Sequence, residues 1–452
     1  MEKLRLQEIA EALHAHCNTD AEITGVCIDT REVVPGSLFV AIKGERFDGH
    51  DFIPKAFELG AAAAVSHKAM DVSGPLLLVH NTRKALLELG GWYRRRFDLF
   101  VAAVTGSVGK TSTKEMIDTV LSAQFKTLKT EGNFNNEIGL PKTLFRLDSS
   151  YEAAVIEMGM SGFGEISRLS RAAQGSVGVI TNIGVSHIEK LGSRENICKA
   201  KLEILDGLRP GAPLVLNGDD DLLHSVALED RPVIRYGIKD QTAAVRAERI
   251  QQQGLETLFD ILFEGRRYQA RIPVIGNHHV MNALAAFAVG IQAGMKPETI
   301  VAALPGYQPS GMRQKIVDCR GIMVVEDCYN ASPDSMRASL GVLRMLDIPG
   351  KRAAVLGDML ELGRYSEQAH RDVGRMAAES GVDRLLCVGP EARFIAEEGR
   401  KSGRIPVCLW FPEKEELAAW LRQNLAAGDA VLFKASRGMK LEEIISAFYG
   451  KE

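Results

Sequence analysis

The stretch LFVAAVTGSVGKTSTKEMIDTVLSA, residues 99–123, decides the fold class. It opens with an apolar run of the length of a buried strand, passes through a glycine-rich turn, and continues in a helical pattern. In the turn, glycines let the backbone amides face inward, Lys110 adds a cation, and the hydroxyl of Thr111 can meet Mg²⁺. A strand that enters a helix through such a loop predicts an α/β protein that binds a phosphate group.

The loop TGSVGKTS departs from the strict phosphate-loop pattern at one position. Val104 stands five residues before Gly109, where that pattern has glycine, so the remaining core is Gly106, Gly109, Lys110 and Thr111. An accidental match would leave only a glycine-rich turn with a solvated lysine. The position between a buried strand and a helix favours a nucleotide site, which would fit a kinase, a GTPase, a motor or a ligase.

Length and composition indicate a globular protein of several domains. At 452 residues the chain is too long for one ordinary core, and we expect three domains on a scale of roughly 100 to 200 residues each. No apolar stretch reaches the roughly 20 residues needed to span a bilayer. The N-terminus lacks the apolar region of a secretory signal, so we expect a cytoplasmic protein without membrane insertion.

Charge and cysteine usage narrow the range of partners. Lys plus Arg total 55 and Asp plus Glu total 58, without a basic block, so small substrates are expected and nucleic acid is not. The seven cysteines are scattered without a CxxC pair. Such spacing fits reduced packing thiols better than disulfides or a zinc site.

The pattern of elements divides the chain into three parts. Residues 1–83 mix short strands, helices and turns, as in a small α/β domain. Residues 84–312 contain further apolar strand candidates, AAVIEMG and VGVITNIG, and predict a large central domain with a mixed or parallel sheet around the phosphate loop. In residues 313–452 strands alternate regularly with helices, which predicts a doubly wound, Rossmann-like sheet that gathers ligands at the carboxyl ends of its strands.

Polar residues in the central part end or follow apolar strands. Glu157 ends the strand AAVIE, where a carboxylate needs a partner such as Mg²⁺, the alternative being a carboxylate that caps a loop. His187 follows the next strand and could join a metal's shell, although a lone histidine there is more often packed and hydrogen-bonded. Lys199 and Lys201 belong to a helical pattern that begins after Arg194, where lysines are ordinarily solvated.

Together these segments resemble the Mur ligase family, the ATP-dependent amide ligases of bacterial cell-wall synthesis. The resemblance covers essentially the whole chain. It rests on an ordered series of motifs: TGSVGKTS (105–112), GNFNNEIGLP (132–141), VIEMG (155–159), TNIGVSHIE (181–189), CKAKLEIL (198–205) and GNHHVMNALAA (276–286). The series is far more specific than any single motif, and it implies ATP and Mg²⁺ as cofactors.

The resemblance also implies roles for individual residues. ATP would contact Gly106, Ser107, Gly109, Lys110, Thr111, Ser112, Asn136, Asn282, Arg313 and Asp327. Mg²⁺ would be held by Thr111, Glu157, His187 and Lys201, the last as a carbamate, which turns a cation into an anionic oxygen ligand. The catalytic set would be Lys110, His187 and Lys201. One departure is visible, because the family reads GxHN where this chain has His279.

The C-terminal part resembles one branch of the family. EDCYNASPDSMRASL (326–340) is similar to the D-x-YNA-x-P-x-SM pattern of the branch that adds D-alanyl-D-alanine to UDP-N-acetylmuramoyl-tripeptide. LGDMLELG (356–363) and KASRGM (434–439) match later blocks of the same branch. This implies that the C-terminal domain binds the incoming dipeptide, with Tyr329, Asn330 and Ser335 on that side.

The N-terminal part resembles the UDP-sugar-binding domain of the later family members. The segments are DTR (29–31) and AIKGERFDGHDF (41–52). They imply contacts with the uridine diphosphate from Thr30, Arg31, Lys43, Gly44, Asp48 and His50, although such residues could equally form an ordinary polar loop.

The resulting prediction is a monomeric carbon–nitrogen ligase that forms the UDP-linked pentapeptide precursor of peptidoglycan through an acyl phosphate. One alternative is another ligase of the superfamily, acting at the tripeptide stage or on folylpolyglutamate, which the segment YNASPDSM disfavours. Others are a phosphotransferase or NTPase switch, and an inactive scaffold that binds UDP-sugar. The third residue of the tripeptide, lysine or diaminopimelate, stays open.

Overall fold

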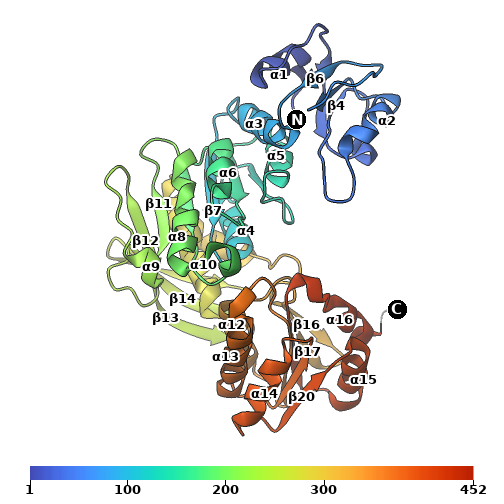
Figure 1. Cartoon of the computed structure of the whole chain (residues 1–452). Coiled ribbons are helices and arrows are strands. Elements are labelled where there is room, and N and C mark those ends of the chain that lie inside the picture. The colour runs from blue at the N-terminus through green and yellow to red at the C-terminus, as the bar shows by residue number, and fades with distance from the viewer. Residues whose placement is uncertain (451–452) are drawn as a thin grey trace.

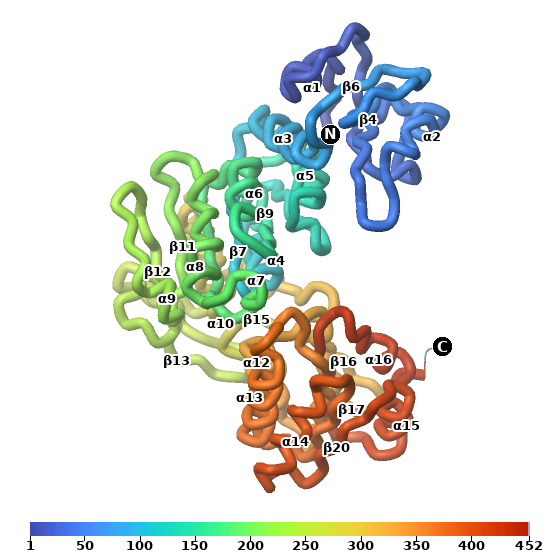
Figure 2. The backbone as a smooth tube through the Cα atoms, in the orientation of Figure 1, coloured from blue at the N-terminus to red at the C-terminus, as the bar shows by residue number. Residues whose placement is uncertain are grey.

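Three bodies of secondary structure follow one another along the chain. The computed structural model describes residues 1–450. The first body carries a four-stranded sheet, the second a nine-stranded sheet and the third a six-stranded sheet. Figures 1 and 2 show the N-terminal body in blue at one end of the molecule, the C-terminal body in orange and red at the other, and the central body between them.

The N-terminal body is a small α/β unit. Its elements are β1 (Leu4–Arg5), α1 (Leu6–Ala12), β2 (Glu22–Ile23), β3 (Gly25–Cys27), η1 (Thr30–Glu32), β4 (Ser37–Val40), η2 (Gly49–Phe52), α2 (Ile53–Glu58), β5 (Ala63–Ser66) and β6 (Leu76–Leu78). Strands β3 to β6 pair in parallel in chain order, and β1 pairs antiparallel with β2. Every residue of β4 and β5 is buried, as expected of parallel strands covered on both faces.

The central body is built on a mixed sheet. Its elements are α3 (Thr82–Arg94), β7 (Phe100–Thr105), α4 (Lys110–Leu121), β8 (Thr127–Lys129), α5 (Gly139–Leu144), β9 (Ala153–Glu157), α6 (Glu165–Ala173), β10 (Val177–Ile180), α7 (Ile188–Leu191), α8 (Arg194–Leu202), η3 (Glu203–Gly207), β11 (Leu214–Asn217), α9 (Asp221–His224), β12 (Val233–Gly237), β13 (Val245–Gln253), β14 (Glu256–Phe263), β15 (Arg266–Ile272), α10 (Asn277–Gln292), α11 (Pro297–Ala303) and η4 (Leu304–Gly306). The strand order is β15-β14-β13-β12-β11-β10-β7-β9-β8. Pairing is parallel from β8 to β13 and antiparallel from β13 to β15, which confirms the mixed sheet expected from the sequence.

The register of three buried strands places the polar residues of the central body at one edge. Val104 of β7 pairs with Glu157 of β9, and Thr105 pairs with Ile180 of β10. Because all three strands are parallel, the loops that follow them leave the sheet side by side. The phosphate loop, Glu157 and the segment after β10 therefore lie together.

The C-terminal body is a doubly wound sheet, as expected from the alternating pattern. Its elements are β16 (Lys315–Cys319), β17 (Ile322–Glu326), α12 (Pro333–Met345), β18 (Arg352–Gly357), η5 (Gly363–Tyr365), α13 (Ser366–Glu379), β19 (Arg384–Val388), α14 (Arg393–Lys401), β20 (Val407–Phe411), α15 (Lys414–Asn424), β21 (Ala430–Lys434), η6 (Arg437–Met439) and α16 (Glu442–Tyr449). The strand order is β16-β17-β21-β18-β19-β20, parallel except for the hairpin of β16 with β17. Helices α12, α13 and α14 share one hydrophobic core with the sheet, and α15 and α16 share another on its opposite face.

The joints between the bodies differ in character. Residues 83 and 84, between which we expect the first domain boundary, lie in the first turn of α3, which packs on α5 and α6 of the central body. One hydrophobic core runs from α1 and β1 into the central body. The second expected boundary, between residues 312 and 313, lies in the segment that joins η4 to β16. Across residues 1–450, no helix has both the length and the apolar character needed to cross a membrane.

A buried arginine ties α3 to the central body. Arg94 is 1% exposed, and its guanidinium donates to the carbonyl oxygens of Ala173 (2.8 Å), Phe97 (2.9 Å) and Gln174 (3.3 Å). Burial lowers the pKa of Arg94 to about 10, so the group keeps its charge at neutral pH. Two carbonyl groups at the end of α6 and one just after α3 thus depend on one side chain.

We predict that Arg94→Ala lowers the free energy of unfolding by about 3 kcal/mol, because it leaves buried carbonyl groups without donors and removes packed atoms. The neighbouring Arg95 is exposed, so Arg95→Ala should change stability by no more than about 0.5 kcal/mol. Urea unfolding of both variants measures the difference. Equal midpoints for the two variants would contradict this role for Arg94.

Candidate active site

A cavity of about 720 Å³ lies where the central body meets the C-terminal body. Its wall combines the phosphate loop, the segments that follow β9 and β10, the first turns of α10, and the segment that follows β17. The expected site residues on this wall are Ser107, Gly109, Lys110, Thr111, Ser112, Asn136, Glu157, His187, Asn282, Arg313, Asp327, Tyr329, Asn330 and Ser335. Residues that we expected to contact ATP, Mg²⁺ and the dipeptide thus line the same cavity.

The phosphate loop takes a shape that only glycine permits. Gly106 has φ +150°, and a Cβ there would lie 1.9 Å from the hydroxyl oxygen of Thr181. Gly109 has φ +80° and immediately precedes α4. The backbone N–H of Val108 donates to Oδ1 of Asn182 at 2.9 Å, which holds the middle of the loop against the end of β10. Gly106 therefore allows the loop to pack closely against Thr181, although it does not itself line the cavity.

The loop offers cationic and polar groups to an anion. Nζ of Lys110 donates to the carbonyl oxygens of Gly106 (2.8 Å) and Ser107 (3.3 Å), and burial lowers the pKa of the amine. The hydroxyl of Ser107 is buried and has no hydrogen-bond partner among the described residues. The first amides of α4 add the positive end of a helix dipole. A phosphate group would satisfy each of these donors.

Two side chains hold Glu157 at the cavity: Thr111, which was expected from the sequence, and Asn135, which was not. The hydroxyl of Thr111 donates to Oε2 of Glu157 at 2.8 Å, and Nδ2 of Asn135 donates to Oε1 at 2.8 Å. The adjacent Asn136 instead accepts the backbone N–H groups of 138 and 139 at the start of α5. The motif NFNN contained both asparagines, but nothing in the sequence distinguished which would face the carboxylate.

The residues expected to hold Mg²⁺ fit that ion if Lys201 is modified. A hydroxyl and a carboxylate are hard donors of the kind that Mg²⁺ prefers, and His187 adds an imidazole. Lys201 is 2% exposed, and burial and then the charge of Lys110 hold its pKa well below the usual range. An ammonium group cannot bind a cation, whereas a carbamate can. Within residues 1–450, no three His, Cys, Asp or Glu side chains gather as a metal cluster.

The first turns of α10 form the part of the cavity wall beside the phosphate loop. Oδ1 of Asn282 accepts a hydrogen bond from the hydroxyl of Thr113 at 2.9 Å. Nε2 of His278 and of His279 lie 2.6 and 2.9 Å from the same oxygen, Oε1 of Gln314, in the segment that leads into the C-terminal body. The histidine that replaces the usual asparagine therefore contacts the interdomain linker.

A buried ion pair shapes the C-terminal wall of the cavity. Nζ of Lys434 lies 2.8 Å from Oδ2 of Asp327 and donates to the carbonyl oxygen of Asn330 at 3.2 Å. The hydroxyl of Ser339 donates to the same Oδ2. Both donors use one carboxylate oxygen, which leaves Oδ1 of Asp327 for a ligand. Sequence reasoning missed Lys434, although it opens the motif KASRGM at the end of β21.

Two further groups complete the wall near the phosphate loop. The guanidinium of Arg313 stacks over the ring of Tyr329, 3.8 Å from its centroid. This contact joins the linker to the segment that follows β17. Arg83 of α3, which received no role from the sequence, also lines the cavity.

The six residues expected to bind uridine diphosphate lie in the N-terminal body, away from this wall. Arg31 ion-pairs with Asp29, and its hydrogen bonds lower the pKa of that carboxyl to about 2. Lys43 and Asp48 form a β-bridge in the loop that carries Gly44, and Thr30 begins η1. His50 is fully buried, with Nδ1 2.5 Å from Oδ1 of Asp48. Asp48 therefore supports η2 as well as facing outward.

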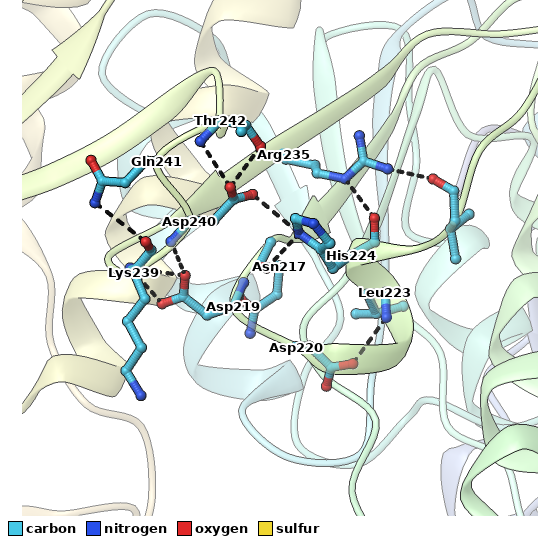
Figure 3. Close-up of polar contacts among 12 residues, drawn as sticks. Asn217, Asp219, Asp220, Leu223, His224, Arg235, Lys239, Asp240, Gln241 and Thr242 are labelled. Atoms are coloured by element: carbon cyan, nitrogen blue, oxygen red, sulfur yellow. Dashed lines mark hydrogen bonds and ion pairs between the residues drawn. The ribbon is translucent and has the colours of Figure 1, made fainter.

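A polar cluster braces the cavity wall from behind. Asp219 accepts the backbone N–H groups of 238, 239 and 240, and Asp240 accepts from Thr242. Figure 3 shows these carboxylates, with His224 beside Asp240. The cluster ties the loop after β11 to the loop after β12. Asn217, at the end of β11, lines the cavity and is held in place by this support.

Comparison with known proteins gives consistent matches along the chain. Family models match residues 22–94 (Mur ligase family, catalytic domain), 104–290 (Mur ligase middle domain) and 312–437 (Mur ligase, glutamate ligase domain). The UDP-N-acetylmuramoyl-tripeptide--D-alanyl-D-alanine ligase of Bacillus subtilis is 40% identical over 433 residues, covering 94% of this chain and 92% of that protein. Crystal structure I of MurF from Acinetobacter baumannii has a TM-score of 0.93 at 32% identity and full coverage of both chains. MurF ligase from Thermotoga maritima in complex with ADP has a TM-score of 0.86 at 30% identity, covering 94% of this chain and 97% of that one.

We predict that Lys434→Met destabilises the protein by about 3 kcal/mol, because the carboxylate of Asp327 stays buried without its counterion. Adding Asp327→Asn removes that charge and should recover part of the loss. The control is Lys401→Met, which removes an exposed lysine paired with Glu398 at the surface and should change stability little. A double-mutant cycle from urea unfolding measures the coupling, and strict additivity of the two changes would rule out the paired role.

Proposed function

This chain belongs to the Mur ligase family, and we propose that it joins D-alanyl-D-alanine to UDP-N-acetylmuramoyl-tripeptide at the cost of ATP. The product is the UDP-linked pentapeptide used in peptidoglycan synthesis. The observation that carries the proposal is the common cavity. There the phosphate loop faces the segment Tyr329–Ser335, whose sequence resembles the dipeptide-adding branch. The relatives named for this reaction match the chain over more than nine-tenths of its length.

The first chemical step activates a carboxylate. A carboxylate is a poor acyl donor because it lacks a good leaving group, so we propose that the terminal carboxylate of the tripeptide attacks the γ-phosphate of ATP. An acyl phosphate and ADP result. Lys110 and the first amides of α4 stabilise the charge that develops on the phosphate oxygens. Bound Mg²⁺ would supply Lewis-acid neutralisation of these oxygens, held by Thr111, Glu157, His187 and carbamylated Lys201.

The second step forms the amide. The free amine of the dipeptide attacks the acyl carbon, a tetrahedral intermediate forms, and inorganic phosphate leaves. We assign Tyr329, Asn330 and Ser335 to the dipeptide side, because they line the cavity opposite the loop. Water would hydrolyse the acyl phosphate, so the position of this chemistry between two protein bodies protects the intermediate.

The nucleotide subsite is assigned from the residues on the same wall. Ser107, Gly109 and Ser112 of the loop would surround the phosphates with Lys110. Among the described residues no hydrogen bond reaches Oδ1 of Asp327, so this oxygen suits a ribose hydroxyl, while Asn282 suits the base. Arg313 joins the two bodies beside the phosphates.

The remaining assignments concern the whole protein. We propose that residues 1–83 bind the uridine diphosphate, residues 84–312 the ATP and residues 313–452 the dipeptide. Arg31 and Lys43 supply cations for the diphosphate, and Thr30 and Gly44 supply hydrogen-bond donors. We assign Asp48 to the same ligand as an acceptor, with His50 supporting it from within. We further propose that the protein acts as a monomer in the cytoplasm.

The test of function is phosphate release with ATP, Mg²⁺ and UDP-N-acetylmuramoyl-tripeptide, with and without D-alanyl-D-alanine. We expect release to depend on the dipeptide and the product mass to rise accordingly. Lys110→Ala should lower kcat by about 10² to 10³, because it removes a preorganised charge contact. The exposed Lys199→Ala should retain activity. Release without the dipeptide would instead favour a phosphotransferase or NTPase, and addition of a single amino acid would favour another ligase.

We also predict that Lys201 is carbamylated. Burial lowers the pKa of its amine and so favours the neutral form, which is the form that adds CO₂. Protein equilibrated with ¹³C-bicarbonate should show a carbamate carbon by NMR. The signal should disappear in Lys201→Ala and persist in Lys199→Ala, two positions earlier on the same helix. A wild-type protein without this signal would exclude the modification.

A further inference from the structure

A loop of the C-terminal body contacts the segment that carries His187. Nδ1 of His187 lies 2.8 Å from Oε2 of Glu361, in the loop between β18 and η5. Both residues have left-handed backbone conformations, with φ +63° at His187 and φ +62° at Glu361. Residues other than glycine adopt this conformation only where the surroundings hold them in it, and such strain concentrates at functional sites. Two strained residues from different bodies therefore meet side chain to side chain.

The backbone on each side of this pair is closely packed. A Cβ at Gly363 would lie 2.8 Å from the side chain of Glu189 in α7, so η5 approaches α7 as only glycine allows. The phenol of Tyr365 donates to the carbonyl oxygen of Gly192 at 3.4 Å. A Cβ at Gly184, before His187, would lie 2.5 Å from a carboxylate oxygen of the C-terminal body. The geometry of the pair is thus set by contacts on both sides of it.

The contact determines which nitrogen of His187 carries the proton. A carboxylate only accepts hydrogen bonds, so Nδ1 must donate its hydrogen to Glu361. In the neutral ring this leaves the lone pair on Nε2. Histidines that bind metals are commonly held in this way, with one nitrogen on a carboxylate and the other free for the ion.

We propose that Glu361 is a positioning residue that prepares His187 to bind Mg²⁺ through Nε2. The proposal rests on the function proposed above, in which His187 is a metal ligand. Because Glu361 belongs to the C-terminal body and His187 to the central body, the ligand is oriented only when the two bodies pack together. The metal site is therefore completed by the body that also holds the dipeptide segment.

An ordinary surface ion pair would behave differently. The side chain of Glu361 is 67% exposed, and exposed pairs of this kind contribute little to stability. Loss of Glu361 should therefore leave the unfolding midpoint unchanged. Its effect should appear in the orientation and metal affinity of His187, which a purely structural role would not alter.

The first readout is the tautomer of His187, measured by two-bond ¹H–¹⁵N NMR on protein labelled at histidine and assigned with His187→Gln. We expect the Nδ1–H form in the wild type. Glu361→Ala should shift the ring toward the Nε2–H form, and Glu361→Gln, which keeps an acceptor oxygen, should lie between them. A wild-type ring protonated at Nε2 would overturn the proposal.

The second readout is binding of Mn²⁺, as a probe for Mg²⁺, followed by EPR in the presence of ADP. We expect His187→Ala to abolish this Mn²⁺ site. Glu361→Ala should lower the affinity of the site for Mn²⁺ by about 10- to 100-fold, which is the usual effect of losing the hydrogen-bond partner of a metal ligand. Glu189→Gln removes an exposed acidic charge two residues from His187, whose ion pair is with Glu361, and should bind Mn²⁺ like the wild type. Equal affinity in Glu361→Ala and the wild type would refute the role.

The two proposals can fail separately. If Glu361→Ala changes both readouts but the wild type forms no amide from the dipeptide, the substrate assignment is wrong. The positioning role of Glu361 toward His187 is then still supported. If the wild type is the ligase and neither readout responds to Glu361→Ala, the pair alone is wrong.

Discussion

The parallel pairing of β7 with β9 and β10 is the constraint on which the site depends. It sets Val104 opposite Glu157 and Thr105 opposite Ile180, so the phosphate loop begins beside a carboxylate and beside the segment that leads to His187. A shift of one residue would turn Glu157 to the other face of the sheet. The apolar side chains that bury these strands therefore also determine the position of the chemical groups.

Burial has a second effect at the same edge, because it alters the amines it encloses. Lys110 and Lys201 both lie in poorly solvated surroundings, and burial is the main cause that lowers the pKa of each. A buried cation needs an anion, and a buried neutral amine can react. Lys110 thus suits a phosphate, while Lys201 suits a modification that gives it the opposite charge. One physical effect prepares two lysines for different tasks.

The sequence predicted the fold class, the mixed central sheet and the doubly wound C-terminal sheet, because hydrophobic periodicity reports directly on strands and helices. That Thr111 of the loop and Glu157 lie together was implied by the resemblance to the Mur ligases, and the hydrogen bond between them agrees with it. Asn135 and Lys434 escaped prediction for a different reason. Their partners are distant in the chain, and only tertiary packing decides that Asn135 reaches Glu157 and that Lys434 neutralises Asp327. The contact of His279 with Gln314 could not be predicted for the same reason, because the two residues are distant in the chain.

The linker between the central and C-terminal bodies has an unusual attachment. Two histidines, His278 and His279, share the single amide oxygen of Gln314, which itself has φ +54°. Because both contacts end on one oxygen, a movement that displaces this oxygen disturbs both hydrogen bonds at once. The attachment consequently couples the first turn of α10 to the C-terminal body, so that rotation of this body would act on both histidines together.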